Sequence, residues 1–423
     1  MLPIQQLQGA MVGMGMIFTE TYRPFFENAY QHGIYDPRTG MISLEIAAVA
    51  SRTGSRAAQY KAEAADGIND FASYIEPDSM QQLLTHDLDF VCVATPDDRH
   101  FEAVMAAIAA GKHVLVEKPS VLSMQQLDQI TDAAQAADVL CKVVYHKLFD
   151  PDHKKLRTLV QDQILQHVNN GYCTLLEPKQ ISSGQFAEWI QGRNPGTYVA
   201  VHYIKLIDFT FGGTLKSVSC SGQRGIVDSA QSQTWDSVQL RMVYEYESGR
   251  EAAFDIHTSW VTPDNFPGYV EQEVQFRFDN GVWNGHSRRR GVECTIEDQT
   301  PFTMKNSMNN HYNGTFVEPN GQRSQRGYGI EVLEQFAREV AFVKNGSTPS
   351  DQKQRLQEIQ ALDYNDISAD RQTVATVQAM EAILKEHAGG TPNCVVQVND
   401  PAGGLVLYAP GQAEGKVLYD GQV

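Results

Sequence analysis

Close cysteine pairs, basic charge and long apolar runs are all scarce in this sequence of 423 residues. The six cysteines are scattered, with no close pair at metal-ligand spacing, so no metal site is expected and reduced thiols are favoured. Lysine and arginine total 34 against 51 acidic residues, a formal net charge of -17. Because a phosphate backbone or an anionic bilayer would repel this surface, nucleic acids and membranes are not expected as partners.

No segment approaches the length of a transmembrane span. The apolar stretch 11–18 is similar to the core of a signal peptide, but no basic region precedes it and no small-residue cleavage site follows it. We therefore expect a cytoplasmic location. The composition, 42% hydrophobic and 20% charged, is globular, and the length indicates two or three domains with cores of their own.

Residues 1–146 alternate short apolar runs with helical patterns, which is typical of a parallel sheet covered by helices. The expected helices include 100–110 and 123–138, the second with Ser123 as its N-cap. The expected strands are 7–12, 44–50, 90–94, 113–116 and 141–145.

The pattern changes after residue 151. A helix at 152–163 precedes runs of period-two alternation, which predict a mostly antiparallel sheet with one open face. We therefore divide the chain into a domain of residues 1–146 and a second of residues 147–423, and the role of 394–423 stays open. The alternating runs are 237–246, 251–258 and 271–278, and further helices are expected at 198–211, 328–343 and 370–386.

A glycine turn follows the first expected strand. Gly13 fits the tight turn, and Gly15 would let a pyrophosphate approach the backbone where a helix begins with Met16 and Ile17. Phe18 replaces the third glycine of this dinucleotide-binding fingerprint, so the match is partial. A loop that merely favours glycine is the alternative.

The end of the second expected strand, Ser51-Arg52, indicates which dinucleotide would bind. A carboxylate at this position would bind the ribose hydroxyls of NAD. A hydroxyl beside a guanidinium instead suits the 2′-phosphate of NADP, because arginine offers paired donors to phosphate oxygens. We expect NADP to be preferred over NAD, the alternative being that Arg52 is a solvated loop residue.

Glu117, Lys118 and Pro119 follow the strand 113–116, at the end of a parallel sheet where ligands bind. Hydride transfer requires a proton to move as well, and partial desolvation of an ammonium favours its neutral amine. Lys118 is therefore a candidate for proton transfer and for polarising a substrate oxygen. A salt bridge between Lys118 and Glu117 is the alternative.

The run 111–119, taken with 91–100, resembles the Gfo/Idh/MocA family, named after glucose-fructose oxidoreductase and inositol dehydrogenase. The resemblance extends over essentially the whole chain. It implies an α/β fold: an N-terminal Rossmann dinucleotide-binding domain followed by an α+β domain on a mostly antiparallel open sheet. It also implies a nicotinamide cofactor and a sugar or cyclitol substrate.

Several residue roles come from this resemblance. It implies that Lys118 is catalytic, lies with Glu117 on the cofactor side, and forms a cis peptide with Pro119. It also places the loop Thr95-Pro96 beside the cofactor and assigns His100 to the architecture of that loop.

A second chemical segment surrounds His202. On a helix, Tyr198, His202 and Lys205 share one face. Many family members carry aspartates at the first and third of these positions, so the resemblance implies proton transfer only for His202, whose ring titrates near neutral pH. Tyr198 would replace the first aspartate as a donor, or pack in the core. Lys205 would contact substrate, or pair with Asp208 or Glu245.

Three further features bear on substrate binding. The resemblance implies a basic residue at the rim of the site after the last Rossmann strand, here His146 or Lys147, to bind substrate hydroxyls. Trp260 would face a sugar ring or a subunit interface. The arginines 288–290 read as a solvated or interface cluster.

Together these features predict an NAD(P)-dependent oxidoreductase that transfers a hydride between nicotinamide and a hydroxyl or carbonyl carbon of a sugar, sugar derivative or cyclitol. One alternative is an NAD(P)-dependent glycoside hydrolase that oxidises its sugar transiently. Another is a non-catalytic dinucleotide- and sugar-binding regulator, although a regulator has no need of Lys118 and His202 as proton-transfer groups. Apolar and aromatic residues on the open sheet predict a homo-oligomer, a dimer or tetramer.

Overall fold

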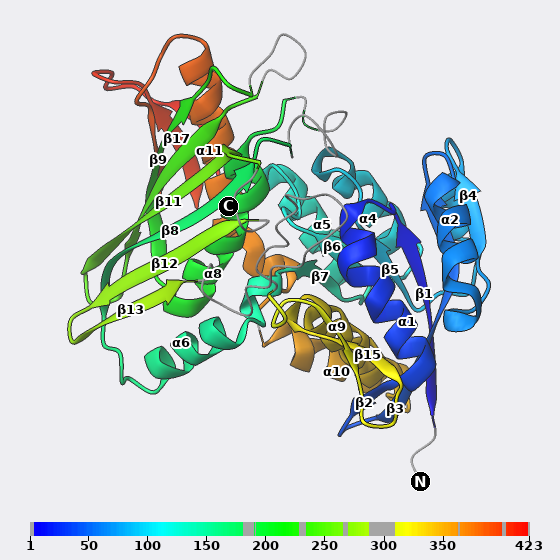
Figure 1. Cartoon of the computed structure of the whole chain (residues 1–423). Coiled ribbons are helices and arrows are strands. Elements are labelled where there is room, and N and C mark those ends of the chain that lie inside the picture. Colours follow the sequence, from blue (N-terminus) through cyan, green and yellow to red (C-terminus); the bar gives the residue numbers. More distant parts are fainter. Residues whose placement is uncertain are drawn as a thin grey trace, which may run out of the picture. The chain divides into compact units, whose positions relative to one another are not determined.

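The computed structural model describes residues 4–180, 190, 192–227, 234–264, 270–286, 309–362, 364–399 and 403–421. The chain forms two compact units, Met1–Phe149 with His311–Arg371, and Asp150–Asn310 with Gln372–Val423 (Figure 1). Each unit has its own sheet and is described separately.

The first unit is an α/β domain on a mostly parallel sheet. In the described part of the chain, seven strands pair in the order β2-β3-β1-β5-β6-β7, with β4 also on β3, and each pairing is parallel except the β2–β3 hairpin. The strand order reverses between β1 and β5, the position where such sheets bind ligands at their carboxyl edge. The strands are β1 (Gln5–Val12), β2 (Ile34–Asp36), β3 (Gly40–Ser51), β4 (Ala72–Ile75), β5 (Phe90–Val93), β6 (His113–Glu117) and β7 (Cys141–Val144).

All five expected strands of this sheet are confirmed, and so are both expected helices. Ser123 caps the second helix, because its Oγ accepts a hydrogen bond from the Gln126 backbone nitrogen at 3.4 Å. The β2–β3 hairpin was not expected from the sequence. The helices of the unit are α1 (Arg23–His32), α2 (Ser55–Ala64), α3 (Ser79–Leu83), α4 (His100–Ala109), α5 (Met124–Ala136), α9 (Tyr328–Lys344) and α10 (Pro349–Gln360). A two-stranded ribbon, β14 (Gly314–Val317) with β15 (Arg323–Arg326), precedes α9.

The helix α9 returns to the first sheet and corrects the expected domain boundary at residue 146. Its apolar face packs on the sheet together with α1, and the rings of Phe336 and Phe90 meet edge to face at 5.5 Å. The opposite face of the sheet carries α4 and α5. Periodicity predicted a helix at 328–343, but periodicity does not say which of two sheets a helix covers.

The second unit is built on a mixed sheet. Within the described residues, nine strands pair in the order β13-β12-β8-β11-β10-β9-β16-β17-β18, antiparallel except for β8 with β11. The strands are β8 (Val168–Pro178), β9 (Thr214–Gln223), β10 (Ser237–Glu245), β11 (Glu251–Thr262), β12 (Glu271–Phe278), β13 (Gly281–His286), β16 (Val395–Asn399), β17 (Gly404–Tyr408) and β18 (Lys416–Tyr419). The helices within its described residues are α6 (Pro151–Gln161), α8 (Val201–Phe211) and α11 (Arg371–Ala388), and all three were expected.

One face of this sheet is apolar and covered, and the other is polar. Leu240 and Phe254 point inward, where Phe254 stacks on Phe211 of α8 at 5.5 Å. The opposite face presents side chains such as Gln239 and Arg241, so the expected apolar open face is wrong. The reason is that strand alternation sends the apolar residues of these strands to the helices. A homo-oligomer stays a prediction, and an interface on this face would be polar.

A buried ion pair links β7 to α9 in the first unit. Lys142 Nζ lies 3.5 Å from Glu339 Oε2, and both side chains are fully buried. Tyr364 and Gln335 donate hydrogen bonds to Glu339 Oε1 at 3.1 and 2.9 Å. Because burying a single charge costs a large desolvation free energy, each of these groups depends on the other to remain charged in the core.

Glu339→Gln should therefore destabilise the first unit, because it leaves the Lys142 ammonium buried without its counter-ion. We expect the free energy of unfolding, measured in urea, to fall by about 3 kcal/mol. Asp138→Asn is the matched control, because it breaks the exposed Lys353–Asp138 pair at 2.8 Å. The control should cost under about 1 kcal/mol, and equal losses would contradict this view of the buried pair.

Candidate active site

The glycine turn lies at the carboxyl edge of the first sheet, beside the reversal of strand order. Gly13 has φ +89°, and a Cβ there would lie 2.5 Å from the carbonyl oxygen of Ala94. Its backbone nitrogen donates to Ala50 O at 2.9 Å. Only glycine combines this φ with so close a contact, so Gly13 makes the tight turn as expected.

Gly15 differs from Gly13 in having space beside it. A Cβ at this position would have Arg56 Nη1 as its nearest neighbour, at 4.0 Å. The helical turn that follows includes Met16 and Ile17, and it widens into the π-helical segment η1 (Phe18–Tyr22). Phe18, which replaces the third glycine of the dinucleotide-binding fingerprint, is buried in the core. Its ring packs edge to face on that of Tyr60 at 5.1 Å.

The end of β3 carries hydroxyls and guanidinium groups. Ser51 Oγ accepts a hydrogen bond from Gly54 N at 3.1 Å, and Arg52 is exposed beside it. Sequence reasoning missed Arg56, whose Nη1 donates to Met14 O at 2.9 Å and so reaches the glycine turn. The spacing of Arg56 after the strand end, on the first turn of α2, is the signal that could have revealed it.

The loop after β5 is tied to the loop after β6 by one histidine. The two ring nitrogens of the buried His100 lie 2.9 Å from Thr95 O and 2.9 Å from Pro119 O. Burial lowers the pKa of His100, against the opposing effects of these carbonyls and of Asp97. His100 therefore holds the Thr95-Pro96 loop against the Lys118-Pro119 peptide. Its role here is structural, because both ring nitrogens contact backbone carbonyl oxygens of these loops.

The strand β6 ends in the buried Glu117 and the half-buried Lys118. The Lys118-Pro119 peptide is cis, as expected from the family resemblance. Glu117 points inward, where its Oε1 accepts a hydrogen bond from the Tyr22 hydroxyl at 3.2 Å. Burial raises the pKa of Glu117 to about 7, although Lys118 and the Tyr22 hydrogen bond oppose the rise.

The basic residues after β7 are buried. His146, in the 3-10 turn η4 (His146–Leu148), has its Nε2 4.0 Å from Glu117 Oε1, and its ring meets that of Tyr312 edge to face at 5.8 Å. Burial, Lys118 and Lys147 lower the pKa of His146 to about 3, so this ring is neutral at neutral pH. Lys147 is also buried.

Asp370 connects the two loops that carry these groups, and sequence reasoning missed it. Its carboxylate accepts hydrogen bonds from Ser120 Oγ at 2.5 Å and from the Tyr145 hydroxyl at 2.7 Å. Ser120 follows the cis-proline peptide and Tyr145 precedes His146. No local sequence signal marks a residue that acts across 225 positions of the chain.

In the second unit, Tyr198 and His202 lie in the π-helical segment η5 (Gly196–Ala200) and the first turn of α8, and both are half-buried. Lys205 is 2% exposed, with its Nζ 3.7 Å from Asp208 Oδ2, and Gln372 also donates to Asp208, at 2.6 Å. Of the two roles expected for Lys205, a substrate contact or an ion pair, the structure contains the ion pair with Asp208. The alternative partner of Lys205, Glu245, pairs with Lys216 instead.

Trp260 packs in the core beside Tyr198. Its side chain is fully buried, its Nε1 donates to Glu177 Oε2 at 2.7 Å, and its ring lies 6.2 Å from that of Tyr198. The expected sugar-facing or interface role of Trp260 is therefore wrong, because β11 turns this residue inward. The arginines 288–290 lie outside the described residues.

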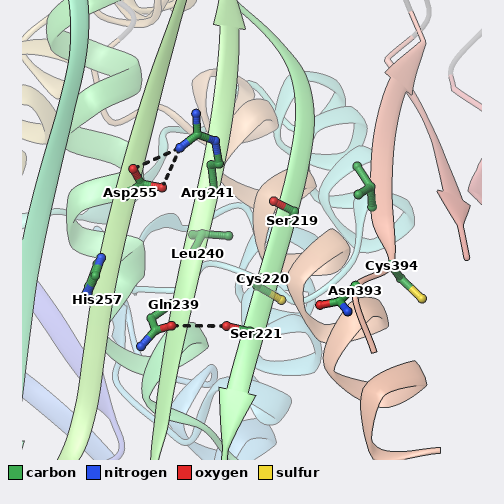
Figure 2. Close-up of a pocket in the computed structure, with 11 residues that line it drawn as sticks. Ser219, Cys220, Ser221, Gln239, Leu240, Arg241, Asp255, His257, Asn393 and Cys394 are labelled. Carbon is green, nitrogen blue, oxygen red and sulfur yellow. Dashed lines mark hydrogen bonds and ion pairs between the residues drawn. The ribbon is translucent and has the colours of Figure 1, made fainter. Parts of the chain in front are cut away.

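A cavity of about 370 Å³ lies on the polar face of the second sheet (Figure 2). Arg241 pairs there with Asp255 at 3.2 Å, and Ser221 bonds Gln239 at 3.3 Å. It contains none of the residues expected to act on substrate, and its charged side chains are already paired with each other. We assign it no chemistry.

Comparison with known proteins identifies the first unit. Residues 7–145 match the model of the "Oxidoreductase family, NAD-binding Rossmann fold", Gfo/Idh/MocA. Residues 7–145 are a Gfo/Idh/MocA domain. The fold and the dinucleotide-binding class expected from the glycine turn and the Glu117-Lys118-Pro119 run are thereby confirmed.

Curated relatives match part of this chain. A scyllo-inositol 2-dehydrogenase (NADP(+)) of Bacillus subtilis is 30% identical over 26% of this chain and 29% of its own length. A D-xylose 1-dehydrogenase (NADP(+)) of Hypocrea jecorina is 35% identical over 27% of this chain and 29% of its own length. The chain thus spans less than a third of these relatives, so their activities do not transfer to it directly.

Solved structures show the same fold along nearly the whole chain. The scyllo-inositol dehydrogenase of Lactobacillus casei, with bound NAD(H) and scyllo-inositol, has a TM-score of 0.60 at 14% identity, covering 93% of this chain and 99% of that one. At this identity the likeness shows that the two chains share their fold over both units, and it shows nothing of the substrate.

The two glycines of the turn provide a matched test of the dinucleotide site. Gly13→Ala should destabilise the first unit by about 2 kcal/mol or more, because of its positive φ and its contact with Ala94. Gly15→Ala should leave the melting temperature unchanged and weaken dinucleotide binding, measured by fluorescence of reduced cofactor, by about tenfold or more. Unchanged affinity in Gly15→Ala would show that the pyrophosphate does not approach this turn.

Proposed function

We propose that this protein is an NAD(P)-dependent oxidoreductase that transfers a hydride between nicotinamide and a hydroxyl or carbonyl carbon of a sugar, sugar derivative or cyclitol. The observation that carries the proposal is Lys118, half-buried on a cis peptide at the carboxyl end of β6, on a Gfo/Idh/MocA domain. Relatives named as inositol, xylose and anhydrofructose oxidoreductases support the substrate class.

The cofactor would be held at the carboxyl edge of the first sheet. Gly13 makes the tight turn there, and Gly15 leaves space beside the backbone. The following helix begins at Met16 and Ile17, and Thr95-Pro96 forms the adjacent loop. When bound, nicotinamide supplies the acceptor or donor of the hydride. The chain's residues bind it, orient the substrate and move the proton.

The proton would move through Lys118 and His202. Both side chains are half-buried, and an amine and an imidazole are groups that can take and return a proton. Tyr198 would donate a hydrogen bond to the substrate, with Trp260 fixed behind it by Glu177. Lys147 would orient substrate hydroxyls, whereas Lys205 would anchor α8 through Asp208.

NADP would be the preferred cofactor. Ser51, Arg52 and Arg56 place hydroxyl and guanidinium groups around the end of β3, and Arg56 is already anchored at the glycine turn. Guanidinium groups bind a 2′-phosphate through paired hydrogen bonds between opposite charges, whereas NAD offers only an uncharged hydroxyl at that position.

Lys118→Ala should abolish most turnover. We would follow reduced-cofactor absorbance with aldoses, uronates, glycosides and inositols, and expect kcat to fall by about a hundredfold or more once proton transfer is lost. Lys112→Ala is the control, because Lys112 lies just before the opposite end of β6 and donates to Leu88 O at 2.9 Å. Full turnover of Lys118→Ala at saturating substrate would refute the proposal, and glycoside cleavage with no net cofactor reduction would favour the hydrolase.

Arg52→Ala and Arg56→Ala should each weaken NADP selectively. Loss of one charge-assisted bond to phosphate corresponds to about a tenfold or larger rise in Kd, and the Kd of NAD should change little. Arg99→Ala is the control, because Arg99 is an exposed arginine of the same unit paired with Glu76 at 3.2 Å. Equal losses for NADP and NAD would show that neither arginine reads the 2′-phosphate.

A further inference from the structure

The helical segment that carries Tyr198 and His202 starts from a buried turn. Asn194 binds the first backbone nitrogens of this segment: its Oδ1 accepts a hydrogen bond from Thr197 N at 2.9 Å, and its backbone oxygen accepts one from Tyr198 N at 3.1 Å. Asn194 and Thr197 are each 2% exposed. The direction in which the segment starts therefore depends on how the Asn194 side chain is held.

A carboxylate of α11 holds that side chain. Glu381 Oε1 accepts a hydrogen bond from Asn194 Nδ2 at 2.7 Å and another from Thr197 Oγ1. Asn194 Nδ2 also donates to Thr197 Oγ1 at 3.2 Å, so the three side chains form one connected network. A satisfied polar network in the interior favours a single arrangement, because any displacement leaves buried donors without their acceptor.

The same turn approaches α11 closely at Gly196. A Cβ on Gly196 would lie 2.6 Å from Met380 Sδ and 3.0 Å from Val238 Cγ1 of β10. Met380 and Glu381 are consecutive residues of α11, so this helix contacts the turn through an apolar and an acidic side chain. All of these residues belong to the second unit. The packing at Gly196 limits how far the turn lies from α11, and the hydrogen bonds to Glu381 limit its orientation.

The segment that follows the turn has an uncommon conformation. π-Helices are rare, occur mostly as single turns and are frequent at functional sites. Tyr198 lies within the π-helical segment η5, and His202 lies in the first turn of α8. The ring of Tyr198 packs against that of Trp260 at 6.2 Å. Tyr198 is thus fixed through its ring by Trp260 and through its backbone by the Asn194 turn.

We propose that Glu381 is a positioning residue, which fixes the start of η5 and thereby the places from which Tyr198 and His202 act on the substrate. Glu381 does so through Asn194 and Thr197. The inference rests on the proposed function and deepens it by adding a residue that acts through others. Proton transfer requires hydrogen-bond distances, so a small displacement of the groups that carry it lowers the rate.

The test combines hydrogen exchange of residues 194–205, read by mass spectrometry on the full-length protein, with steady-state kinetics. Glu381→Ala removes the acceptor, so the amides of η5 should exchange about tenfold faster and kcat should fall about tenfold. The Kd of the reduced cofactor, measured by its fluorescence, should stay unchanged, because the residues proposed to bind it lie in the first unit. Glu381→Gln keeps an acceptor oxygen and should restore most of kcat and of the slow exchange.

Glu386→Ala is the matched control. Glu386 is an acidic residue of the same helix, and its Oε1 lies 3.1 Å from Lys416 Nζ. Its exchange over 194–205 and its kcat should equal those of wild type. A role of Glu381 in stability alone would lower the melting temperature of Glu381→Ala and leave kcat per folded molecule unchanged, which would overturn the inference.

Exchange and turnover separate this inference from the proposed function. Faster exchange with full kcat in Glu381→Ala would leave the oxidoreductase standing and remove the role of Glu381. A wild type inactive on every sugar and cyclitol would refute the proposed function and the link to catalysis, while exchange would still decide whether Glu381 fixes η5. Should Glu381→Ala fail to fold, Thr197→Val decides, because it removes one donor to Glu381 and keeps the backbone nitrogen. Unchanged exchange and kcat in that variant would overturn the inference.

Discussion

The close approach of β1 and β5 at Gly13 is the constraint on which the first unit depends. No side chain fits between Gly13 and the Ala94 carbonyl, so the chain must turn there. That turn directs Gly15 and the following helix to the carboxyl edge, and it fixes where the loop after β5 leaves the sheet. His100 then ties this loop to the cis-proline peptide, and Asp370 ties Ser120 to Tyr145. Four strand ends are thus connected by backbone and buried side-chain contacts, without relying on surface ion pairs.

Desolvation is the second constraint on the first unit, because it shifts the pKa values of the ionisable side chains at the carboxyl edge of the first sheet. The same burial that raises the pKa of Glu117 lowers that of His146, so a carboxyl group and an imidazole 4.0 Å apart need not form an ion pair. Lys142 and Glu339, by contrast, form a buried ion pair, and Gln335 and Tyr364 donate further hydrogen bonds to the Glu339 carboxylate. The Lys142–Glu339 pair stabilises the fold because both groups stay charged. Burial of Glu117 instead brings the charged and neutral forms of its carboxyl group closer in free energy.

Local pattern predicted most elements of the fold from the sequence, but not their partners. Strand alternation and helix periodicity gave β12 and α5 to within a residue or two, since both depend on neighbours along the chain. The sheet that α9 covers, the inward turn of Trp260 and the bridging role of Asp370 depend on residues far away in sequence. The candidate site divides in the same way: Gly13 and Lys118 stand in local motifs, whereas Arg56 and Tyr22 gain meaning only from what they contact.

In the proposed function, Tyr198 in place of the aspartate that the family resemblance implies would leave more of the acid–base chemistry to Lys118. A carboxylate four residues before His202 would stabilise an imidazolium, and a tyrosine, neutral near pH 7, cannot do so by charge. The carboxylate of Asp208, on the same helix, is engaged by Lys205 and Gln372. In the proposed function, His202 would therefore transfer its proton without the aspartate four residues before it. Lys118, half-buried on its cis peptide, would then be the proton-transfer group on which turnover depends most.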